Sequence, residues 1–341
     1  MEKKAPLIGL TLEGLRRVVA ECGLPSFAAK QIARRLYVNR ATSICEMTEL
    51  SKQARSRMEQ TYEVGRHAPL TEARSSDGTA KYLFPGVGDR NIESVYIPDG
   101  ERATICVSSQ AGCKMNCSFC MTGRQGFHGN LTATDIINQV LSIPESEKLT
   151  NLVFMGMGEP LDNLQPVLDA IEILTAPWGL AWSPKRITVS SIGKLRELKT
   201  LVETTKVHIA ISLHSPYPSE RGSLMPVEKA MPMNDVLELL RNYDFAHQRR
   251  LSFEYTMFRG VNDDARHCRE LAKILRGFDC RVNLIRFHAI PDSDLQPCSM
   301  AQMERFRDQL NEDGITATIR ASRGEDIMAA CGMLAGKKKE N

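Results

Sequence analysis

The strongest constraint on the fold is a rhythm that begins at residue 102, where short apolar runs alternate with amphipathic stretches. The runs have the length and composition of buried strands, and the stretches have the spacing of helices that cover a sheet. Repeated units of this kind form a parallel sheet with helices outside it. The sequence therefore predicts an α/β fold containing a partial (β/α)6 barrel. The runs are ATICVSS, NLVFMGM, RITVSSI, VHIAISL, LSFEYTM, RVNLIRF and TATIRAS, and the stretches are TATDIINQVLSI, LQPVLDAIEIL, LRELKTLV, MNDVLELLRNY, ARHCRELAKIL and MERFRDQLNED.

Polar and glycine-rich residues follow the apolar runs directly. GEP comes after NLVFMGM, SSIG after RITV, SLHSP after VHIAI, and HAIP after RVNLIRF. In barrels of parallel strands the chemistry gathers where the strands end. We therefore expect the functional site at the carboxyl ends of these strands.

The chain before the barrel has two further patterns. Residues 1–66 show apolar residues at helical spacing and predict a small helical N-terminal domain. Residues 67–101 contain two β segments, TAKYLFPG and NIESVYIPDG, with turn residues between them. The expected organisation is thus a helical domain (1–66), a β-rich extension (67–101) and a barrel with a C-terminal segment (102–341).

The charge of the chain is unevenly distributed. The net charge is +3, but residues 1–66 carry twelve Lys and Arg against seven Asp and Glu, and the other 275 residues sum to −2. A basic surplus on a small domain indicates a surface that contacts phosphate groups. A solvated helical surface would explain the same surplus.

The composition excludes several classes of protein. The N-terminus, MEKKAPLIGL, has no apolar stretch long enough for a signal peptide, and no run of about 18 apolar residues predicts a membrane span. The expected location is the cytoplasm. In that reducing compartment the ten cysteines are not read as a disulfide framework. Half of them are scattered and are expected to be small core or surface residues: Cys22, Cys45, Cys268, Cys280 and Cys298.

Three other cysteines have the spacing C-x3-C-x2-C, namely Cys113, Cys117 and Cys120, on the loop after the first βα strand. Zinc is one explanation, but structural zinc usually takes four ligands and catalytic zinc more often uses His or carboxylate ligands. Three thiolates suit a 4Fe-4S cluster with one open iron, whereas ferredoxins use four cysteines. The spacing resembles that of the radical S-adenosylmethionine (SAM) superfamily. The stretch Gly156–Pro160, at the end of the next strand, resembles the GGEP segment that binds the amino group of SAM in that superfamily.

A closer resemblance is carried by CVSSQAGCKMNCSFC, FMGMGEPLDN, AISLHSP and RGEDIMAACGMLAG. These stretches, the basic N-terminal part and the additional cysteines resemble the RlmN/Cfr family of radical-SAM RNA methyltransferases over the whole chain. The resemblance implies a radical-SAM partial barrel that binds a 4Fe-4S cluster through Cys113, Cys117 and Cys120. It also implies that Cys331 carries the methyl group, that Cys106 is its partner thiol and that Glu93 is a proton acceptor. The implied SAM contacts are Gly158, Glu159, Ser190, Ser212, Leu213, His214 and His288. His288 departs from the pattern, because the family usually has Asn at this position.

The family's target is an amidine carbon of adenine, which is a poor nucleophile toward the electrophilic methyl of SAM. The resemblance implies a radical route that uses two SAM molecules per turnover. Cys331 first takes a methyl group from one SAM by displacement. A 5′-deoxyadenosyl radical from the second SAM then removes hydrogen from this methyl, and the resulting radical adds to adenine. After loss of the ring proton, Cys106 attacks the sulfur of Cys331, releases the methylated RNA and leaves a transient disulfide. Either Cys106 or Glu93 would remove the proton.

The leading hypothesis is an RlmN-type enzyme that methylates carbon 2 of an adenosine in the peptidyl-transferase region of 23S rRNA, before the ribosome is fully assembled, and of the adenosine 3′ of the tRNA anticodon. A Cfr-type enzyme, which methylates carbon 8 and confers antibiotic resistance, shares every motif quoted. A non-catalytic iron–sulfur protein that binds RNA or senses redox state is a third reading. The family resemblance further implies a monomer, a flavodoxin-type electron donor and no membrane association.

Recognition of RNA is expected to use the basic helices for phosphate contacts and a pocket for an extruded adenosine. Four residues are candidates for lining that pocket, with surface ion pairs as the alternative explanation for their presence. They are Gln110, Arg124, Arg320 and Arg323.

Overall fold

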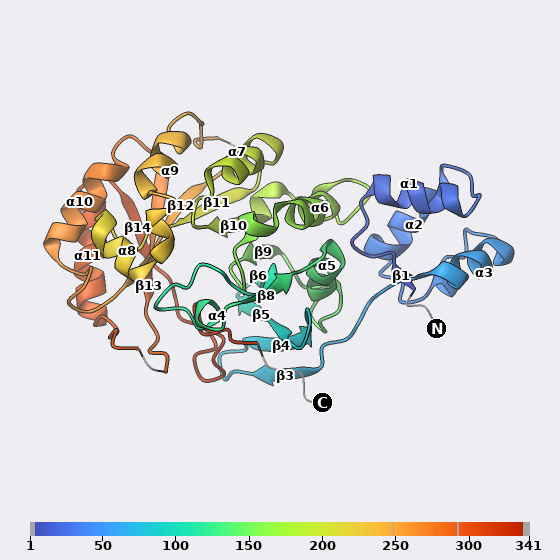
Figure 1. Cartoon of the computed structure of the whole chain (residues 1–341), viewed down its shortest axis with the longest axis horizontal. Helices are drawn as coiled ribbons and strands as arrows, with labels where there is room; N and C mark the ends of the chain where they lie inside the picture. The colour runs from blue at the N-terminus through green and yellow to red at the C-terminus, as the bar shows by residue number, and fades with distance from the viewer. Residues whose placement is uncertain (1–3, 248, 292, 337–341) are drawn as a thin grey trace.

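The computed structural model describes residues 4–247, 249–291 and 293–336, and in this part of the chain the centre is a sheet in the order β14-β13-β12-β11-β10-β9-β6-β5-β4-β3 (Figure 1). From β6 to β14 every neighbouring pair is parallel. The extension strands β3, β4 and β5 continue the sheet beyond β6 as antiparallel neighbours. The strands are β3 (Thr71–Arg74), β4 (Ala80–Pro85), β5 (Asn91–Asp99), β6 (Arg102–Cys106), β9 (Asn151–Phe154), β10 (Ile187–Ser191), β11 (His208–Ser212), β12 (Leu251–Met257), β13 (Cys280–Arg286) and β14 (Thr316–Ile319).

A helical connection leads from each parallel strand to the next, as the sequence predicts, and the helices lie outside the sheet (Figure 1). The predicted α/β fold with a partial barrel is therefore confirmed. Among the helices that cover the sheet, α8 was not predicted, because its sequence, PSERGSL, contains too few apolar residues to give a helical pattern. The helices are α5 (Ala133–Leu141), α6 (Leu164–Thr175), α7 (Leu195–Thr204), α8 (Pro218–Leu224), α9 (Met233–Leu240), α10 (Ala265–Leu275) and α11 (Met300–Glu312).

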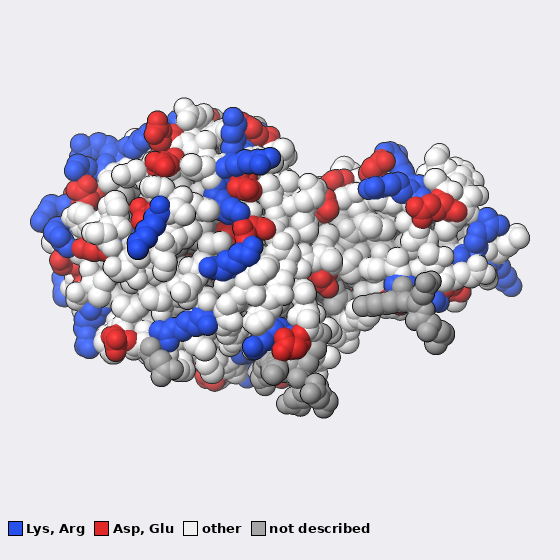
Figure 2. Space-filling model, viewed as in Figure 1, with Lys and Arg blue, Asp and Glu red and all other residues white. Residues whose placement is uncertain are grey.

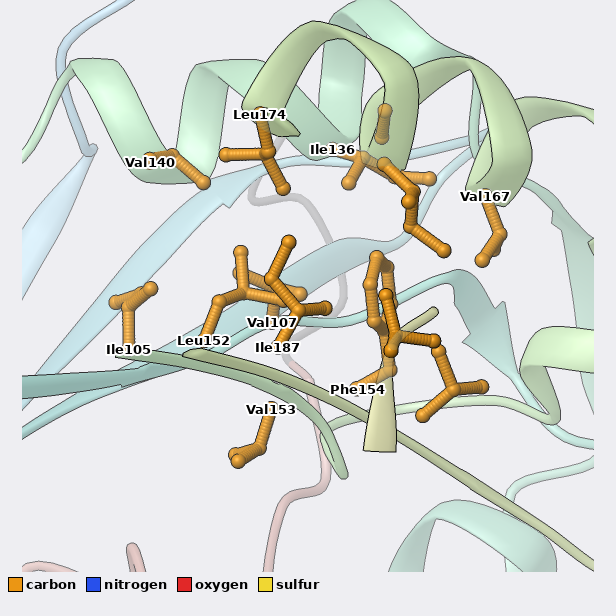
Figure 3. Close-up of a cluster of buried hydrophobic side chains, with 14 of the residues drawn as sticks. Ile105, Val107, Ile136, Val140, Leu152, Val153, Phe154, Val167, Leu174 and Ile187 are labelled. Carbon is orange, nitrogen blue, oxygen red and sulfur yellow. The ribbon is translucent and has the colours of Figure 1, made fainter. Parts of the chain in front are cut away.

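The core between the sheet and the helices explains why the apolar runs are nearly continuous. Figure 3 shows Leu152, Phe154 and Ile187 pointing toward the helices, whereas Val153 points to the opposite side of the sheet. Both sides are covered, because Leu152 is fully buried and Val153 is only 7% exposed. Each such side chain contributes about 1.5–3 kcal/mol when it is removed from water. Alternate residues of a strand therefore face the helices and the barrel lumen.

The N-terminal residues form a separate small lobe at one end of the molecule (Figure 1). Its two short strands, β1 and β2, pair in parallel, and the helix α1 is capped by Thr11, whose side chain accepts a hydrogen bond from the Gly14 backbone N–H. Both basic and acidic side chains lie on the visible face of this lobe (Figure 2). The elements are β1 (Ala5–Pro6), α1 (Leu12–Glu21), α2 (Ala28–Ala33), a π-helical turn (Arg34–Val38), a 3-10 turn (Ile44–Glu46), α3 (Lys52–Thr61) and β2 (Tyr62–Glu63).

The lobe contacts the barrel through α5 and the segment after α6. The Thr134 hydroxyl donates a hydrogen bond of 2.6 Å to the carbonyl of Ile8. The rings of Tyr37 and Trp178 lie 6.0 Å apart, and Arg66 donates to carbonyl oxygens on both sides of the boundary. These contacts fix the position of the lobe on the barrel.

After β14 the chain returns across the mouth of the barrel as an irregular segment, residues 320–336. Two carboxylates anchor its first half: Asp77 accepts a hydrogen bond of 3.0 Å from the Gly324 N–H, and Asp326 accepts one from the Ser76 N–H. The Met121 N–H then donates to the Gly332 carbonyl at 2.8 Å. The segment, which we call the C-terminal segment, therefore brings Cys331 beside the loop that carries the cysteine triplet.

Two exclusions made from the sequence can be compared with the fold. Among the helices of the described residues, none has both the length and the apolar character needed to cross a membrane. All ten cysteines lie in the described part of the chain, and each is a free thiol there.

Candidate functional site

A cavity lies at the carboxyl ends of the parallel strands, where the polar strand ends predicted it. It holds about 910 Å3 of space outside the protein atoms, partly open to solvent. A second cavity of about 520 Å3 adjoins it, and the two share part of their walls, including Arg320 and Cys331. Of the residues predicted from the sequence, the first cavity is lined by Cys113, Cys117, Cys120, Gly158, Glu159, Ser190, Ser212, His214 and Cys331.

The cysteine triplet lies on a loop that the structure holds in place at several points. The strands β7 (Gln110–Gly112) and β8 (Phe127–Asn130) pair in antiparallel orientation at its base. Asn116 has a positive φ of 49°, and the short helix α4 (Met121–Arg124) ends the loop. The Cys113 N–H donates a hydrogen bond of 2.9 Å to the Gly126 carbonyl. The loop thus directs the three sulfur-bearing residues into one cavity wall.

The donor set at this wall fits an iron–sulfur cluster. Burial raises the pKa of Cys113 to about 12, and it also raises the pKa of Cys117 and Cys120. The neighbouring thiols raise these pKa values further, so three thiolates would repel each other without a bound cation. A coordinated metal removes thiol protons outright. Three soft ligands on one cavity wall suit a three-cysteine cluster site, although no group of three or more His, Cys, Asp or Glu residues in the described part of the chain is already arranged to hold a metal ion.

The GEP segment follows β9 and is fixed by Gln110. Gly158 has φ +97°, and a Cβ placed there would lie 2.5 Å from the Gln110 Cβ, so the position requires glycine. The Glu159 N–H donates a hydrogen bond of 2.9 Å to Gln110 Oε1, while Gln110 Nε2 donates to Asn130. Gln110 is fully buried. It therefore stabilises the backbone around the site, and its side chain is not free to contact RNA.

The carboxylate of Glu159 lies at the centre of a buried hydrogen-bond network. It accepts hydrogen bonds from the Ser191 hydroxyl at 2.6 Å and from the backbone N–H groups of Leu161 and Ile192. Burial raises the pKa of Glu159 to about 7, although these donors lower it. The network connects the end of β9 to the end of β10, where Ser190 faces the cavity.

The SLH stretch after β11 is held from behind by Arg221. This arginine is fully buried and donates hydrogen bonds of 3.0 Å to the carbonyl oxygens of Ser212 and Leu213. Its charge is paired with Glu228, which is also buried. Leu213 is completely buried and does not line the cavity, so only Ser212 and His214 of this stretch reach it.

His214 is fixed in one orientation. Its φ of +59° is unusual for a residue with a side chain, and Asn262 supports the strain by donating a hydrogen bond of 2.7 Å to the His214 carbonyl. The Thr256 N–H donates to His214 Nδ1 at 2.9 Å. Burial, and to a lesser extent Arg221, lowers the pKa of His214 to about 3. The imidazole is therefore neutral, and its remaining proton is on Nε2.

The second cavity brings together the two cysteines outside the triplet. Cys106, at the end of β6, and Cys331, on the C-terminal segment, both line it, together with Cys120. Burial raises the pKa of Cys106 to about 12, and the neighbouring Cys331 adds to this. Cys331 is exposed and also lines the first cavity. It therefore stands between the triplet and Cys106.

Besides Leu213, two other predicted catalytic or SAM-binding residues lie outside both cavity walls. Glu93 is buried, forms an ion pair of 3.1 Å with Lys81 and accepts hydrogen bonds from the N–H groups of Ala335 and Gly336. His288 contacts Ser322 and Glu325 instead, at 3.0 and 3.2 Å. In this arrangement both residues bind the C-terminal segment, which the sequence did not indicate.

Other residues of the site were not predicted, or were predicted for another purpose. Glu254, on β12, is 3% exposed and lines the first cavity, with Oε2 lying 3.5 Å from Arg320 Nη1. A single Glu within the apolar run LSFEYTM is the sequence feature that could have indicated this buried carboxylate. Arg221 and Asn262 gave no such signal, because each reads as an ordinary surface residue in sequence.

The remaining candidates for the RNA pocket are positioned differently from one another. Arg320 lines both cavities. Arg124 donates hydrogen bonds to the carbonyl oxygens of Pro291 and Ser118, and Arg323 forms an exposed ion pair with Asp99. Only Arg320 is thus placed to face a ligand in the cavities.

Comparisons with known proteins agree with this site. A family model described as the radical SAM superfamily matches residues 107–272, and one described as a ribosomal RNA large subunit methyltransferase N-terminal domain matches residues 5–64. A probable dual-specificity RNA methyltransferase RlmN of Bacteroides thetaiotaomicron is 58% identical over 340 residues, covering 100% of this chain and 99% of the relative. The dual-specificity RNA methyltransferase RlmN of a Marinomonas species is 40% identical and covers 98% of this chain and 94% of its own.

Among solved structures, a radical SAM methyltransferase from Sphaerobacter thermophilus has a TM-score of 0.90 at 37% identity, covering 97% of this chain and 99% of its own. The match extends over the N-terminal lobe, the barrel and the C-terminal segment together. Sequence identity at this level along the whole chain, on the same fold, leads to one conclusion: the chain belongs to the RlmN family of radical-SAM methyltransferases.

Proposed function

We propose that the protein methylates carbon 2 of an adenosine in the peptidyl-transferase region of 23S rRNA, and of the adenosine directly 3′ of the anticodon in tRNA. Membership of a family whose relatives are named dual-specificity RNA methyltransferases supports this proposal. The observation that carries it is the position of Cys331, which lies on the wall shared by the two cavities. A group carried on this sulfur has the cluster loop on one side and Cys106 on the other.

The residues for the two cofactors are proposed from the family resemblance, and most of them line the first cavity. Cys113, Cys117 and Cys120 would hold a 4Fe-4S cluster. SAM would be held by GEP backbone groups at Gly158 and Glu159, by the hydroxyls of Ser190 and Ser212, and by the remaining residues of the predicted set. When bound, the cluster and SAM supply one-electron cleavage chemistry and the methyl group. The rest of the predicted set consists of Leu213, whose contribution is backbone only because its side chain is buried, His214 and His288.

Cys331 is proposed to carry the methyl group, and its exposure on the wall of the first cavity supports this role. Its thiolate would displace the methyl of one SAM molecule. A second SAM per turnover would activate the methyl carried on this sulfur for addition to adenine. The protein and the RNA are then joined through Cys331, and this linkage must be broken.

Cys106 is proposed to break that linkage. Its thiolate attacks the sulfur of Cys331, an S–S bond forms, and the electron pair of the broken C–S bond passes to the methylated base, which takes up a proton. Burial raises the pKa of Cys106 to about 12, so this thiol must lose its proton before it can attack. Glu93 remains a candidate for the proton acceptor, but it must first be released by Ala335 and Gly336. If a Glu93→Gln variant releases methylated RNA at the wild-type rate, Glu93 does not remove the ring proton, and Cys106 is the remaining candidate.

RNA binding is proposed to use the helical domain, residues 1–66, together with the cavities. The surplus of Lys and Arg in this domain supports phosphate contacts, and an adenosine extruded from its stack could enter between Arg320 and Cys331. The β-rich extension, 67–101, and the barrel with its C-terminal segment, 102–341, would form the catalytic body. We further propose a cytoplasmic monomer that modifies 23S rRNA before full assembly of the ribosome and takes electrons from a flavodoxin-type donor.

The first test is the mass of the Cys331 peptide from protein expressed with iron and methionine available. One added methyl group, absent from a Cys331→Ala variant, is expected. An unmodified peptide, from protein whose filled cluster cleaves SAM, would contradict the carrier mechanism. Mass spectrometry of digested RNA then decides between methylation at carbon 2 and the Cfr-type product at carbon 8.

A further inference from the structure

The lumen of the barrel changes character from one end to the other. Alternate residues of a strand face the lumen. If residue i of a strand faces the lumen at the cavity, residues i−2 and i−4 face it at successively deeper levels. At the cavity end these are Cys106, Ser190, Ser212, Glu254 and Ile285. Two positions earlier the residues are small or polar: Thr104, Thr188, Ala210, Ser252 and Asn283. Two positions earlier again they are Arg102, Arg186, His208, Arg250 and Arg281.

These last five residues, which we call the basal ring, lie at the amino ends of the parallel sheet. Arg102, His208 and Arg281 are in β6, β11 and β13, and Arg186 and Arg250 directly precede β10 and β12. The registers Ile209↔Leu251 and Ser252↔Arg281 place His208 on β11 and Arg281 on β13, on either side of β12, which Arg250 directly precedes. Val153 in Figure 3 shows the direction of this face, pointing away from the helices that Leu152 meets. All four arginines of the ring are exposed and His208 is half-buried. The ring therefore lies at the solvent-exposed amino end of the barrel.

The basal ring carries uncompensated positive charge. Within the described residues, none of its four guanidinium groups has an ion pair or a side-chain hydrogen bond, whereas Arg323 nearby pairs with Asp99. The members affect one another: burial, then Arg250, Lys185 and Arg102, lower the pKa of His208 to about 4. Burial, and then Arg281 and Arg102, lower the pKa of Arg250. These like charges therefore lie close enough to affect one another, without a neutralising ion pair within the described residues.

A surface of this composition matches a polyanion. Lys185 and Lys206 are exposed and extend the ring along the ends of β10 and β11, so the cations form a band and not a single-phosphate pocket. A band of cations fits a backbone with repeated phosphates. We propose that the basal ring, with Lys185 and Lys206, is a second RNA-binding surface at the end of the barrel opposite the candidate active site. It would contact phosphates of the substrate remote from the modified adenosine, and it rests on the proposed action on RNA.

The geometry favours RNA over an acidic electron donor. A reductant must approach the cluster cysteines, and these lie at the other end of the strands. The distance along β6 from Arg102 to Cys106 is about 13 Å, so a folded RNA can reach both ends of the barrel while a donor docked at the base is held away from the cluster. An isolated anticodon stem–loop lacks the rest of the tRNA, which is the part that the ring is proposed to contact.

The test compares two holoenzyme variants with the same change in charge. The ring variant is R102Q/R186Q/R250Q/R281Q, and its control is K199Q/R269Q/K273Q/R307Q, which neutralises exposed cations on the outer helices α7, α10 and α11. Equilibrium binding of a full-length tRNA transcript and of its isolated anticodon stem–loop is measured by fluorescence anisotropy over a range of salt concentrations. Each lost phosphate contact lowers the slope of log K against log salt by about 0.7–0.9.

The ring variant is expected to lose about two to four units of this slope with full-length tRNA, to bind the stem–loop as the wild type does, and to melt no lower than the wild type. The control should keep the wild-type slope. Equal slopes for the two variants, in a wild type that binds and methylates tRNA, would overturn the second surface and leave the proposed function intact. A wild type that binds no RNA would remove both proposals. The second surface would also be overturned if the ring variant kept the wild-type slope with RNA and lost only binding of inorganic pyrophosphate or reduction by flavodoxin. If the quadruple variant does not fold, R102Q/R186Q and R250Q/R281Q are each expected to lose one to two units of slope, and unchanged slopes overturn the proposal.

Discussion

The backbone N–H of Ala335 donates a hydrogen bond of 2.8 Å to the carboxylate of Glu93, across the whole length of the barrel domain in sequence. Gly336 donates to the same oxygen at 3.1 Å, and Lys81 pairs with the other oxygen. One buried carboxylate thus ties the C-terminal segment to β5. The segment carries Cys331, so the anchor sets where the proposed methyl carrier rests.

Replacing Glu93 by Gln should loosen the C-terminal segment. The ion pair with Lys81 is lost and the charge-assisted hydrogen bonds weaken, so we expect a drop of about 1–3 kcal/mol in the free energy of unfolding. Amide hydrogen exchange of residues 329–336 should become faster. Glu101→Gln, an exposed carboxylate on the neighbouring β5–β6 turn, is the control. Unchanged exchange in the Glu93 variant would mean that this carboxylate does not hold the segment.

Replacing Cys106 by Ala should trap the protein on its RNA. If Cys106 resolves the linkage at Cys331, the variant should accumulate a covalent protein–RNA adduct with the cluster and SAM present. The adduct is detected as a nuclease-sensitive band of higher mass on a denaturing gel. A Cys106→Ala/Cys331→Ala double variant should give none, and Cys280→Ala, a buried thiol remote from both cavities, should behave as the wild type. Release of methylated RNA by Cys106→Ala at the normal rate would remove the resolving role.

Substituting Ala at Gly158 should damage the site more than the fold. The new Cβ would press against the Gln110 side chain at a φ of +97°, which would disturb the hydrogen bond to the Glu159 N–H. We expect a loss of about 1–3 kcal/mol in stability and at least tenfold weaker SAM binding by calorimetry. Gly222→Ala is the matched control, because it lies in α8 with its nearest neighbour at 3.9 Å. That substitution should be neutral or stabilise by about 0.5–1 kcal/mol.

The buried pair Arg221–Glu228 predicts a recoverable loss of stability. Arg221→Met leaves Glu228 buried without its partner, and the expected cost is about 3–5 kcal/mol in urea denaturation. Arg221→Met/Glu228→Gln removes the unpaired charge and should recover part of that loss. A double variant no more stable than the single one would show that lost packing and carbonyl hydrogen bonds, and not the unpaired charge, set the cost.

His214 should make the cluster-free protein sensitive to acid. Its pKa in the folded state is about 3, whereas an unfolded histidine titrates near its ordinary value of about 6.5. Between these pH values the unfolded chain binds the extra proton, so stability is present above pH 6.5 and is lost as the pH falls toward 3. His214→Asn keeps an acceptor for the Thr256 N–H, tolerates φ +59° and does not titrate. The wild type should lose on the order of a few kcal/mol more than this variant across the window; parallel curves would contradict the burial of a neutral imidazole.

The sequence anticipated the architecture because its signals are local. A run such as LSFEYTM and a stretch such as LQPVLDAIEIL have periods that belong to a strand and to a helix, and they became β12 and α6. The same holds for the triplet of cysteines and for GEP, whose residues are close together in the chain and meet at one cavity wall. Family membership, predicted from these motifs, is confirmed by the whole-length relatives.

The roles of Glu93 and His288 could not be derived in this way. Their partners, Ala335 for the one and Ser322 for the other, lie in a segment without regular structure, and no period in the sequence reports where such a segment returns. Their proposed parts in catalysis and SAM binding stay predictions. Arg221 was missed for a similar reason, since a charged residue in a short helix has no local mark of burial.

The sequence by itself determined the order of the parallel strands and of most helices that connect them, the class of fold, and the cysteines and glycines that only one kind of site requires. The tertiary structure decided which face of each strand looks into the lumen. A parallel strand covered on both sides shows no alternation of polar and apolar residues, so Arg102, Arg250 and Arg281 cannot be assigned to one ring until the register is known. It also decided the meeting of Cys106 and Cys331, because contact between residues so far apart in the chain depends on closing the barrel and not on any local preference.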